Sequence, residues 1–305
     1  MDGFALDQDG DLDQLLTSRL FDTLGILNTS LEQLADAYHL SVHQWVPLIQ
    51  PSTLRDKLAT LRSAPLAELA TFMLQLVLVV PPSSFSRSRV PILDPHLSRH
   101  LYSRCRDSFS LLQANRRDCL LTIQSGILLS IHEQSQRLYS DAYISLSACA
   151  SLGYVMGLDS NADFSDPFSL EKKLAWHAIY FGDVVNKLSL ERCSRPMLVP
   201  AYATFTKRSI PWNPSPELLD SPATFESSWS RNFAKFDHID RQAEAVKVLH
   251  RVLQLTRHQA VCLETLVDQE VWKLDFLIQE GIRNAISAPS NRLEHQYSLV
   301  VIFLL

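Results

Sequence analysis

The scarcity of glycine is the feature that most constrains what this chain can fold into. Only 8 of the 305 residues are glycine, which is about a third of the usual frequency. Gly-rich phosphate loops, doubly wound sheets and turn-dense β-sandwiches need glycine wherever the backbone turns tightly. Helices need few glycines, and 46% of the residues are hydrophobic, which is enough for a sizeable core. The sequence therefore predicts an all-α fold.

Start signals for helices recur along the chain. A Ser or Asp accepts the free N–H groups at a helix start, and a Pro at the first position loses no hydrogen bond. The signals are Ser30 with Gln33, Ser52, Pro65, Asp94 with Pro95, Asp118, and Asp166 with Pro167. With the apolar spacing they predict about 8–10 helices, the first near residues 12–27 and the second from Ser30 to Pro47. Because no fixed-period repeat is present, we expect an irregular multi-helix array.

Proline interrupts this pattern in residues 196–222, which we expect to lie extended. Two further helical blocks follow, residues 233–286 and 292–305. The last block is apolar to its final residue and carries no stop signal. We expect an acidic segment with a first helix in residues 1–30, and one domain in residues 31–305 that is C-terminally incomplete.

Charge is concentrated at the start of the chain. The net charge is -5, and it comes from five aspartates among the first 13 residues. The remainder is neutral, which argues against a generally basic nucleic-acid-binding surface. A local exception is a basic run of arginines: Arg87, Arg89, Arg99, Arg104, Arg106, Arg116 and Arg117. This run is a candidate phosphate-contacting patch, but we favour a solvated helix face.

Cysteine usage and apolar runs indicate the compartment. The cysteines are dispersed and form no C-x-x-C pair: Cys105, Cys119, Cys149, Cys193 and Cys262. This pattern is typical of reduced intracellular thiols rather than of a disulfide framework or a zinc site. No signal-peptide pattern opens the chain. The apolar runs at 72–80 and 297–305 are too short to span a bilayer, so we expect no membrane association.

Motifs that would indicate an enzyme or a metal site are weak. His96 and His100 would share a helix face, but no third ligand accompanies them. The alternating acids that begin at Asp7 resemble a calcium loop, yet the twelfth position is Ser18 rather than Glu. No P-loop, G-x-G-x-x-G or G-x-S-x-G pattern occurs. We therefore expect no catalytic residue, no metal and no cofactor.

The stretch from Leu174 to Pro200 holds the most informative polar residues. Helical spacing places Asp183 on or beside an apolar stripe that includes Trp176. A carboxylate there is costly unless it is paired, and Lys187 and Arg195 are the candidate partners. We favour a structural Asp183 that locks a helix to its outgoing loop. A ligand or catalytic carboxylate remains the alternative, with His177, Asp183 and Arg195 as its polar groups.

These residues resemble the regulatory domain, or middle homology region, of fungal-specific transcription factors. That domain has an aromatic helix with a Trp, an Asp about two turns later, and a Gly-Arg-Pro just beyond. Trp176, Asp183, Arg195 and Pro196 occupy those places. Residues 34–58, 142–159 and 293–305 are similar to other stretches of the domain, so the resemblance covers residues 31–305.

Two departures from the family pattern are Ser194, where Gly is usual, and His177, where a second Trp is common. The cysteines of the family's zinc cluster are absent, so zinc binding and direct DNA contact by that route are not expected. The resemblance implies a nuclear, non-enzymatic transcription regulator that acts through a protein partner or small-molecule effector. The alternative is a small-molecule-binding protein or enzyme built on the same helical fold. A third possibility is direct DNA binding through the basic run.

Overall fold

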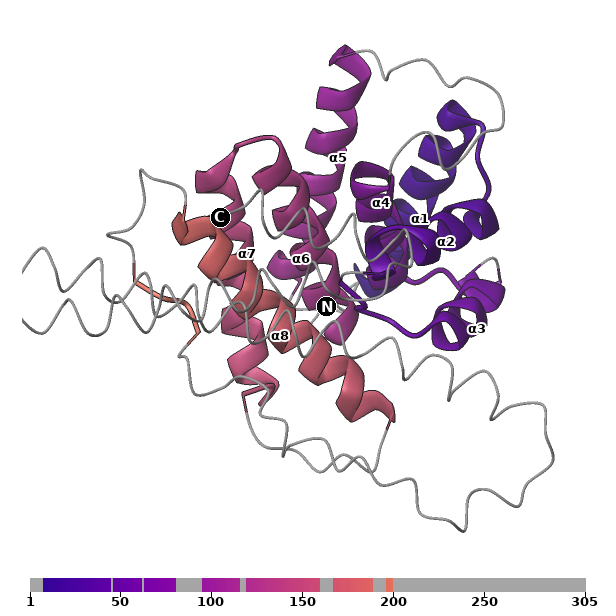
Figure 1. Cartoon of the computed structure of the whole chain (residues 1–305). Coiled ribbons are helices and arrows are strands. Elements are labelled where there is room, and N and C mark those ends of the chain that lie inside the picture. The colour runs from indigo at the N-terminus through magenta and orange to yellow at the C-terminus, as the bar shows by residue number, and fades with distance from the viewer. Residues whose placement is uncertain are drawn as a thin grey trace, which may run out of the picture. The chain divides into compact units, whose positions relative to one another are not determined.

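The computed structural model describes residues 8–44, 46–61, 63–80, 95–115, 119–159, 167–188 and 196–199 (Figure 1). Of these residues, 82% are helical, in eight α-helices and without a strand. The predicted all-α fold is confirmed. The chain divides into two compact units, residues 1–182 and 183–305. The predicted division after residue 30 stays a prediction, and most of the Pro-rich segment lies outside the described residues.

The described part of the first unit holds seven complete α-helices and a short 3₁₀ turn. They are α1 (Gln8–Leu27), α2 (Leu31–Leu40), η1 (Val42–Gln44), α3 (Pro51–Leu61), α4 (Ala67–Val79), α5 (Pro95–Ala114), α6 (Leu120–Ser135) and α7 (Tyr139–Val155). A further helix, α8 (Pro167–Leu188), begins in this unit and ends in the second. None of the helices in the described part combines the length and apolar content that a bilayer span requires.

Three helix starts follow the local rules that predicted them. The Ser30 hydroxyl accepts the Gln33 N–H at 3.2 Å, and the Gln33 side chain accepts the Ser30 N–H at 3.0 Å. This reciprocal pair is the capping box that the sequence predicts for α2. Pro95 and Pro167 are the first residues of α5 and α8. At that position a proline sacrifices no helical hydrogen bond.

Three other starts differ from the prediction by one or two residues. Helix α3 begins at Pro51, so Ser52 is already helical. Helix α4 begins two residues after Pro65, and helix α6 has Cys119 rather than Asp118 at its N-cap. Neither of these two caps uses a side-chain hydrogen bond. Contacts with other parts of the fold, rather than the side chains of the N-cap residues, therefore stabilise these two starts.

Helix α2 ends well before Pro47, which the sequence predicted as its stop. The Ser41 hydroxyl donates to the Ala37 carbonyl at 2.6 Å and closes the last turn. The Tyr38 hydroxyl then accepts the Leu48 N–H at 3.1 Å, from a residue ten positions further on. Because Tyr38 is completely buried, this bond fixes the chain as it folds back over α2.

Helices α4 and α6 form the interior of the first unit. Every residue from 120 to 130 is buried, and α4 is buried along almost its whole length. Helices that are buried on all sides belong to the core of a large domain. Helix α6 packs against α4, α5 and α7 (Figure 1). At Gly126 an added Cβ would lie 2.5 Å from Phe109 and would also collide with Cys149, so this glycine lets three helices approach closely.

The first helix is part of this packing. Helix α1 packs on α4, and Leu16 and Leu20 are completely buried. The Asp13 carboxylate accepts the Ala67 N–H at 2.9 Å, at the first residue of α4. A carboxylate at a helix N-terminus satisfies a free donor and interacts favourably with the helix dipole. Helix α1 therefore contributes both apolar cover and an N-terminal cap to α4.

Candidate functional site

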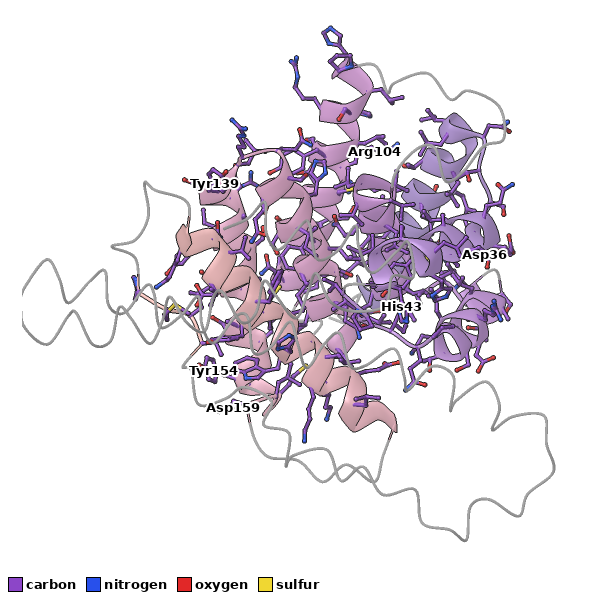
Figure 2. The ribbon with its side chains drawn as sticks, in the orientation of Figure 1. Asp36, His43, Arg104, Tyr139, Tyr154 and Asp159 are labelled. Carbon is purple, nitrogen blue, oxygen red and sulfur yellow. The ribbon has the colours of Figure 1, made fainter. Side chains whose placement is uncertain are left out.

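The aromatic residue of the predicted signature packs against the end of α7. Trp176 on α8 is buried, with 3% of its surface exposed. The Trp176 ring lies edge-on to the ring of Tyr154, with 5.0 Å between the two ring centroids. Tyr154 is labelled in Figure 2. A Cβ at Gly153 would lie 2.7 Å from the Trp176 ring, so the glycine makes room for the indole. Trp176 thus has a packing role between α7 and α8.

The signature carboxylate is Asp183, near the end of α8. Asp183 is completely buried. One of its oxygens, Oδ2, accepts the Leu198 N–H at 2.6 Å and the Val199 N–H at 3.4 Å. Both donors follow Pro196, which is exposed. The carboxylate therefore holds the backbone that leaves the helix, while the predicted partner Arg195 lies outside the described residues.

Four other described polar side chains of α8 are buried as well, and one of them, Glu171, accepts a hydrogen bond from the residue before α3. They are Glu171, His177, Asn186 and Lys187. Glu171 accepts the Gln50 N–H at 2.9 Å, and burial raises the pKa of its carboxyl group. His177 and Asp183, which the alternative function would use, are therefore enclosed rather than open to solvent.

The opening stretch of the family resemblance contains a second buried hub, around Tyr38. Burial raises the pKa of Tyr38 above its usual range, and the His43 ring nitrogen lies 3.4 Å from its hydroxyl. Burial lowers the pKa of His39 to about 4, with a further contribution from Arg55. A histidine with that pKa is neutral at physiological pH. Tyr38 and His39 therefore serve the local packing rather than a charged site.

A polar cluster that the sequence did not predict lies where α5, α6 and α7 meet. Glu133 on α6 is completely buried and accepts the Tyr102 hydroxyl at 2.9 Å. The Arg106 Nη1 atom donates to the same hydroxyl at 3.3 Å. That nitrogen also lies 3.0 Å from an oxygen of Asp141 on α7. A chain of polar contacts thus connects a buried acid to the partly exposed Arg106–Asp141 pair.

The electrostatics of this cluster favour a proton on the buried acid. Burial raises the pKa of Glu133 to about 7, against the lowering effect of bonds from Ser145 and Tyr102 and of the Arg106 charge. The Asp141 charge raises it further. Burial and the adjacent Glu133 raise the pKa of Tyr102 above its usual range. Glu133 can therefore bind or release a proton near neutral pH, although solvent does not reach it directly.

No local motif announces this cluster, but two signals accompany it. Glu133 is a carboxylate near the end of an otherwise uncharged helix, at the border of its completely buried stretch. Tyr102 and Arg106 are four residues apart on α5, so they share one helix face. Neither signal shows that Glu133 lies opposite Tyr102 and Arg106, because that depends on how α5 and α6 pack.

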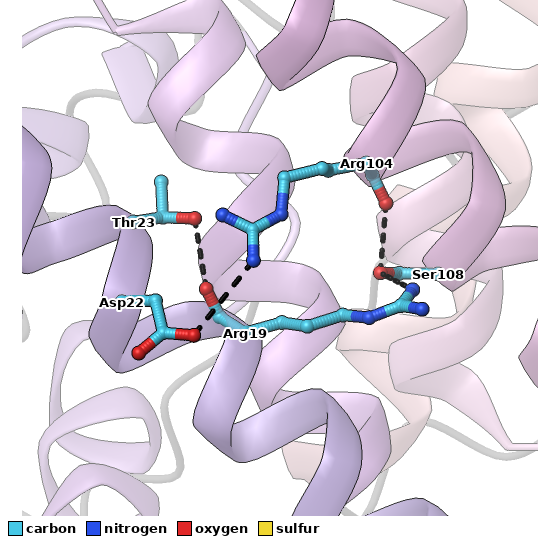
Figure 3. Close-up of polar contacts among 5 residues, drawn as sticks. All are labelled: Arg19, Asp22, Thr23, Arg104 and Ser108. Carbon is cyan, nitrogen blue, oxygen red and sulfur yellow. Dashed lines mark hydrogen bonds and ion pairs between the residues drawn. The ribbon is translucent and has the colours of Figure 1, made fainter.

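The basic run is partly used in contacts within the protein. Arg104 lies 3.8 Å from Asp22 on α1, and Arg19 donates to Ser108 at 3.5 Å (Figure 3). Arg106 contacts Asp141 as described. Of the arginines in the described part of the run, Arg99 alone is exposed. Two of the three described arginines therefore contact neighbouring helices. The other four members of the run lie outside the described residues.

Metal ligands do not gather within the described ranges. No group of three His, Cys, Asp or Glu side chains there could hold an ion. His96 and His100 are exposed on the first turns of α5. Cys105, Cys119 and Cys149 are free thiols, and burial raises the pKa of Cys105 and Cys149. A thiol with a raised pKa is a poor nucleophile.

Comparison with known proteins adds no relative. A scan against protein-family models finds no match, and neither the search of curated proteins nor that of solved structures finds a significant one.

Proposed function

We propose that this chain is a regulatory domain of the fungal transcription-factor type, which acts through a protein partner or a small-molecule effector rather than by catalysis. In this role it is nuclear, carries no cofactor and reaches DNA only through another protein or another module. The resemblance of Trp176, Asp183, Arg195 and Pro196 to the family signature motivates the assignment.

The observation that carries the proposal is the position of Asp183. Its buried carboxylate receives two backbone N–H groups from residues just beyond Pro196. A carboxylate engaged in this way stabilises a change of chain direction, and its complete burial keeps it out of contact with solvent. The most conspicuous acid of the signature therefore has an architectural use. This supports a binding or regulatory domain over an enzyme.

A reporter assay tests the proposal. The full chain, fused to an unrelated DNA-binding domain, should raise or lower transcription from a reporter that carries the cognate site. The Asp183→Ala fusion should lose this effect, because the fold around α8 is weakened. The matched control is Asp159→Ala, at an exposed aspartate just after α7 (Figure 2), which should keep the effect. A folded wild-type fusion that leaves activating and repressing reporters unchanged would refute the regulatory role.

A second candidate function, binding of a small polar molecule, is favoured by the buried polar side chains of α8. In that case His177, Asp183 and Arg195 would contact the ligand. Mass spectrometry of the full chain under native conditions should then reveal a co-purified molecule, and His177→Leu should abolish its retention. Recovery of the chain at its own mass alone, with no bound molecule, would count against this function.

A further inference from the structure

Glu133 is the one described acid that combines complete burial with hydroxyl partners and no cation in direct contact. Tyr102 bonds to it at 2.9 Å, and the Ser145 hydroxyl also faces it. Arg106, the nearest described cation, is held by Tyr102 and Asp141 instead. Hydroxyl groups can donate or accept, so the site accommodates Glu133 with or without its proton.

The titratable neighbours of Glu133 come from two helices. Helix α5 contributes Tyr102 and Arg106, and helix α7 contributes Asp141 and the buried Cys149. On the side of α4, His132 contacts the Leu78 carbonyl at 3.2 Å. The titratable residue of α4 is Glu68, ten residues before Leu78 and hence about 15 Å away along the helix. On the side of α8, the neutral Gln134 donates to the Gly182 carbonyl.

Arg106 is placed between two acids. Its Nη1 atom is 3.0 Å from Asp141, and the Tyr102 hydroxyl is the single group between it and Glu133. While Glu133 is neutral, Asp141 is the favoured partner. Once Glu133 loses its proton, a buried negative charge lies two hydrogen bonds from the guanidinium. Attraction in a buried site is less screened than at the surface, so Glu133 then competes for Arg106.

We propose that Glu133 is the proton-binding group of a switch at the α5–α6–α7 junction, in which loss of its proton draws Arg106 from Asp141 and loosens α5 from α7. The switch responds to pH near neutrality, in agreement with the pKa of about 7 that burial gives Glu133. It does not depend on the proposed regulatory function.

The first test follows the titration of Glu133 in the full chain. Carbon-13 NMR of labelled glutamate carboxyls gives the midpoint, and Glu133→Gln identifies the signal. Arg106→Gln removes a positive charge and should raise the midpoint. Asp141→Asn removes a negative charge and should lower it, each by about tenfold in proton affinity. Arg104→Gln, on the same helix but paired with Asp22 on α1, is the matched control and should leave the midpoint unchanged.

The second test measures how tightly α5 packs against the rest of the fold. Amide hydrogen exchange of α5, corrected for the intrinsic effect of pH, should be about tenfold faster at about pH 8 than at about pH 5. Glu133→Gln should remove this difference, and the amides of α4 should not show it. Loss of the pH difference in Glu133→Gln distinguishes a proton-linked site from a structural ion pair, because exchange near a purely structural Arg106–Asp141 pair would not depend on the Glu133 proton.

Three results would each overturn the switch. They are a Glu133 midpoint at the ordinary value for glutamate, shifts of the same sign in Arg106→Gln and Asp141→Asn, and wild-type α5 exchange that does not depend on pH. The third needs no variant, so a substitution that fails to fold leaves the switch open to refutation.

Discussion

Asp183 and Glu133 are both completely buried carboxylic acids on helices, yet their partners differ in kind. Asp183 accepts two backbone N–H groups, which can only donate. Glu133 accepts the Tyr102 hydroxyl, which in turn accepts from Arg106. A donor-only environment requires an acceptor oxygen, whereas a hydroxyl tolerates either protonation state. Burial alone therefore does not determine what a buried acid does; the chemistry of its partners does.

The two acids also differ in which parts of the chain their hydrogen bonds connect. The Asp183 bonds join residues 15 and 16 positions apart on the chain, so they fix a local change of direction. The contacts of Glu133 join three helices, so they bear on how those helices pack. We expect the first acid to matter chiefly for stability and the second chiefly for the pH dependence of stability.

The largest effect is expected at Asp183. Asp183→Ala strands two backbone donors in the interior and should lower the free energy of unfolding by about 3 kcal/mol. Asp183→Asn keeps an acceptor oxygen and should lower it by about 1 kcal/mol. Urea denaturation of the full chain measures both, with Asp159→Ala as the exposed control. A loss below about 0.5 kcal/mol in Asp183→Ala would show that the N–H contacts contribute little.

A smaller, pH-dependent effect is expected at Glu133. Its native pKa is raised to about 7, so the native state holds the proton more tightly than the unfolded state does. The stability of the wild type should therefore fall as pH rises from about 4.5 to about 7, and the contribution should stay constant above that range. Glu133→Gln has no such loss.

Between about pH 5 and about pH 8, the free energy of unfolding of the wild type should therefore fall by about 2 kcal/mol relative to that of the Glu133→Gln variant. Denaturation curves over this range give the difference, and Glu32→Gln on the exposed face of α2 serves as control. Parallel pH profiles for the Glu133 variant and wild type would remove the basis for contrasting the two acids.

Tyr102→Phe should have an intermediate effect of about 1 kcal/mol at neutral pH, because it removes one hydrogen bond within the cluster. The Tyr102 bond lowers the pKa of Glu133, so its loss should also move the titration midpoint of Glu133 upward. Denaturation and carboxyl NMR on the same variant measure the two effects together. If stability drops while the midpoint stays, Tyr102 is only a packing residue.

The smallest effect is expected at an exposed acid. Asp22 lies 3.8 Å from Arg104, and its side chain is 62% exposed. Solvent-exposed ion pairs contribute little because water and salt screen them. Asp22→Asn should therefore change the free energy of unfolding by less than about 0.5 kcal/mol. A larger loss in denaturation would mean that the α1–α5 contact depends on this pair rather than on apolar packing.

Local sequence rules account for part of the fold. Ser30 with Gln33 predicts the start of α2, and Pro95 predicts the start of α5, because these signals act within one turn. The path of the chain after α2 could not be predicted in that way. It depends on the Tyr38 hydroxyl, which reaches the Leu48 N–H of a different segment.

In the candidate sites, too, local spacing predicts some features, and contacts between distant segments determine the others. Helical spacing alone indicates that Asp183 is buried, and the structure agrees. Its observed donors, Leu198 and Val199, depend on the path that the chain takes after Pro196. The Glu133 cluster has no local sequence motif, because its members are brought together by the packing of α5, α6 and α7.

The cap that Asp13 provides to α4 has a practical consequence for shortened versions of the protein. A chain that began at residue 31 would lack the acceptor of the Ala67 N–H. It would also uncover the surface of α4 against which α1 packs, where apolar residues such as Leu69 and Met73 are buried. Such a fragment should be prone to aggregation, because exposed apolar surface promotes association. Expression trials should therefore retain the residues from Gln8 onward.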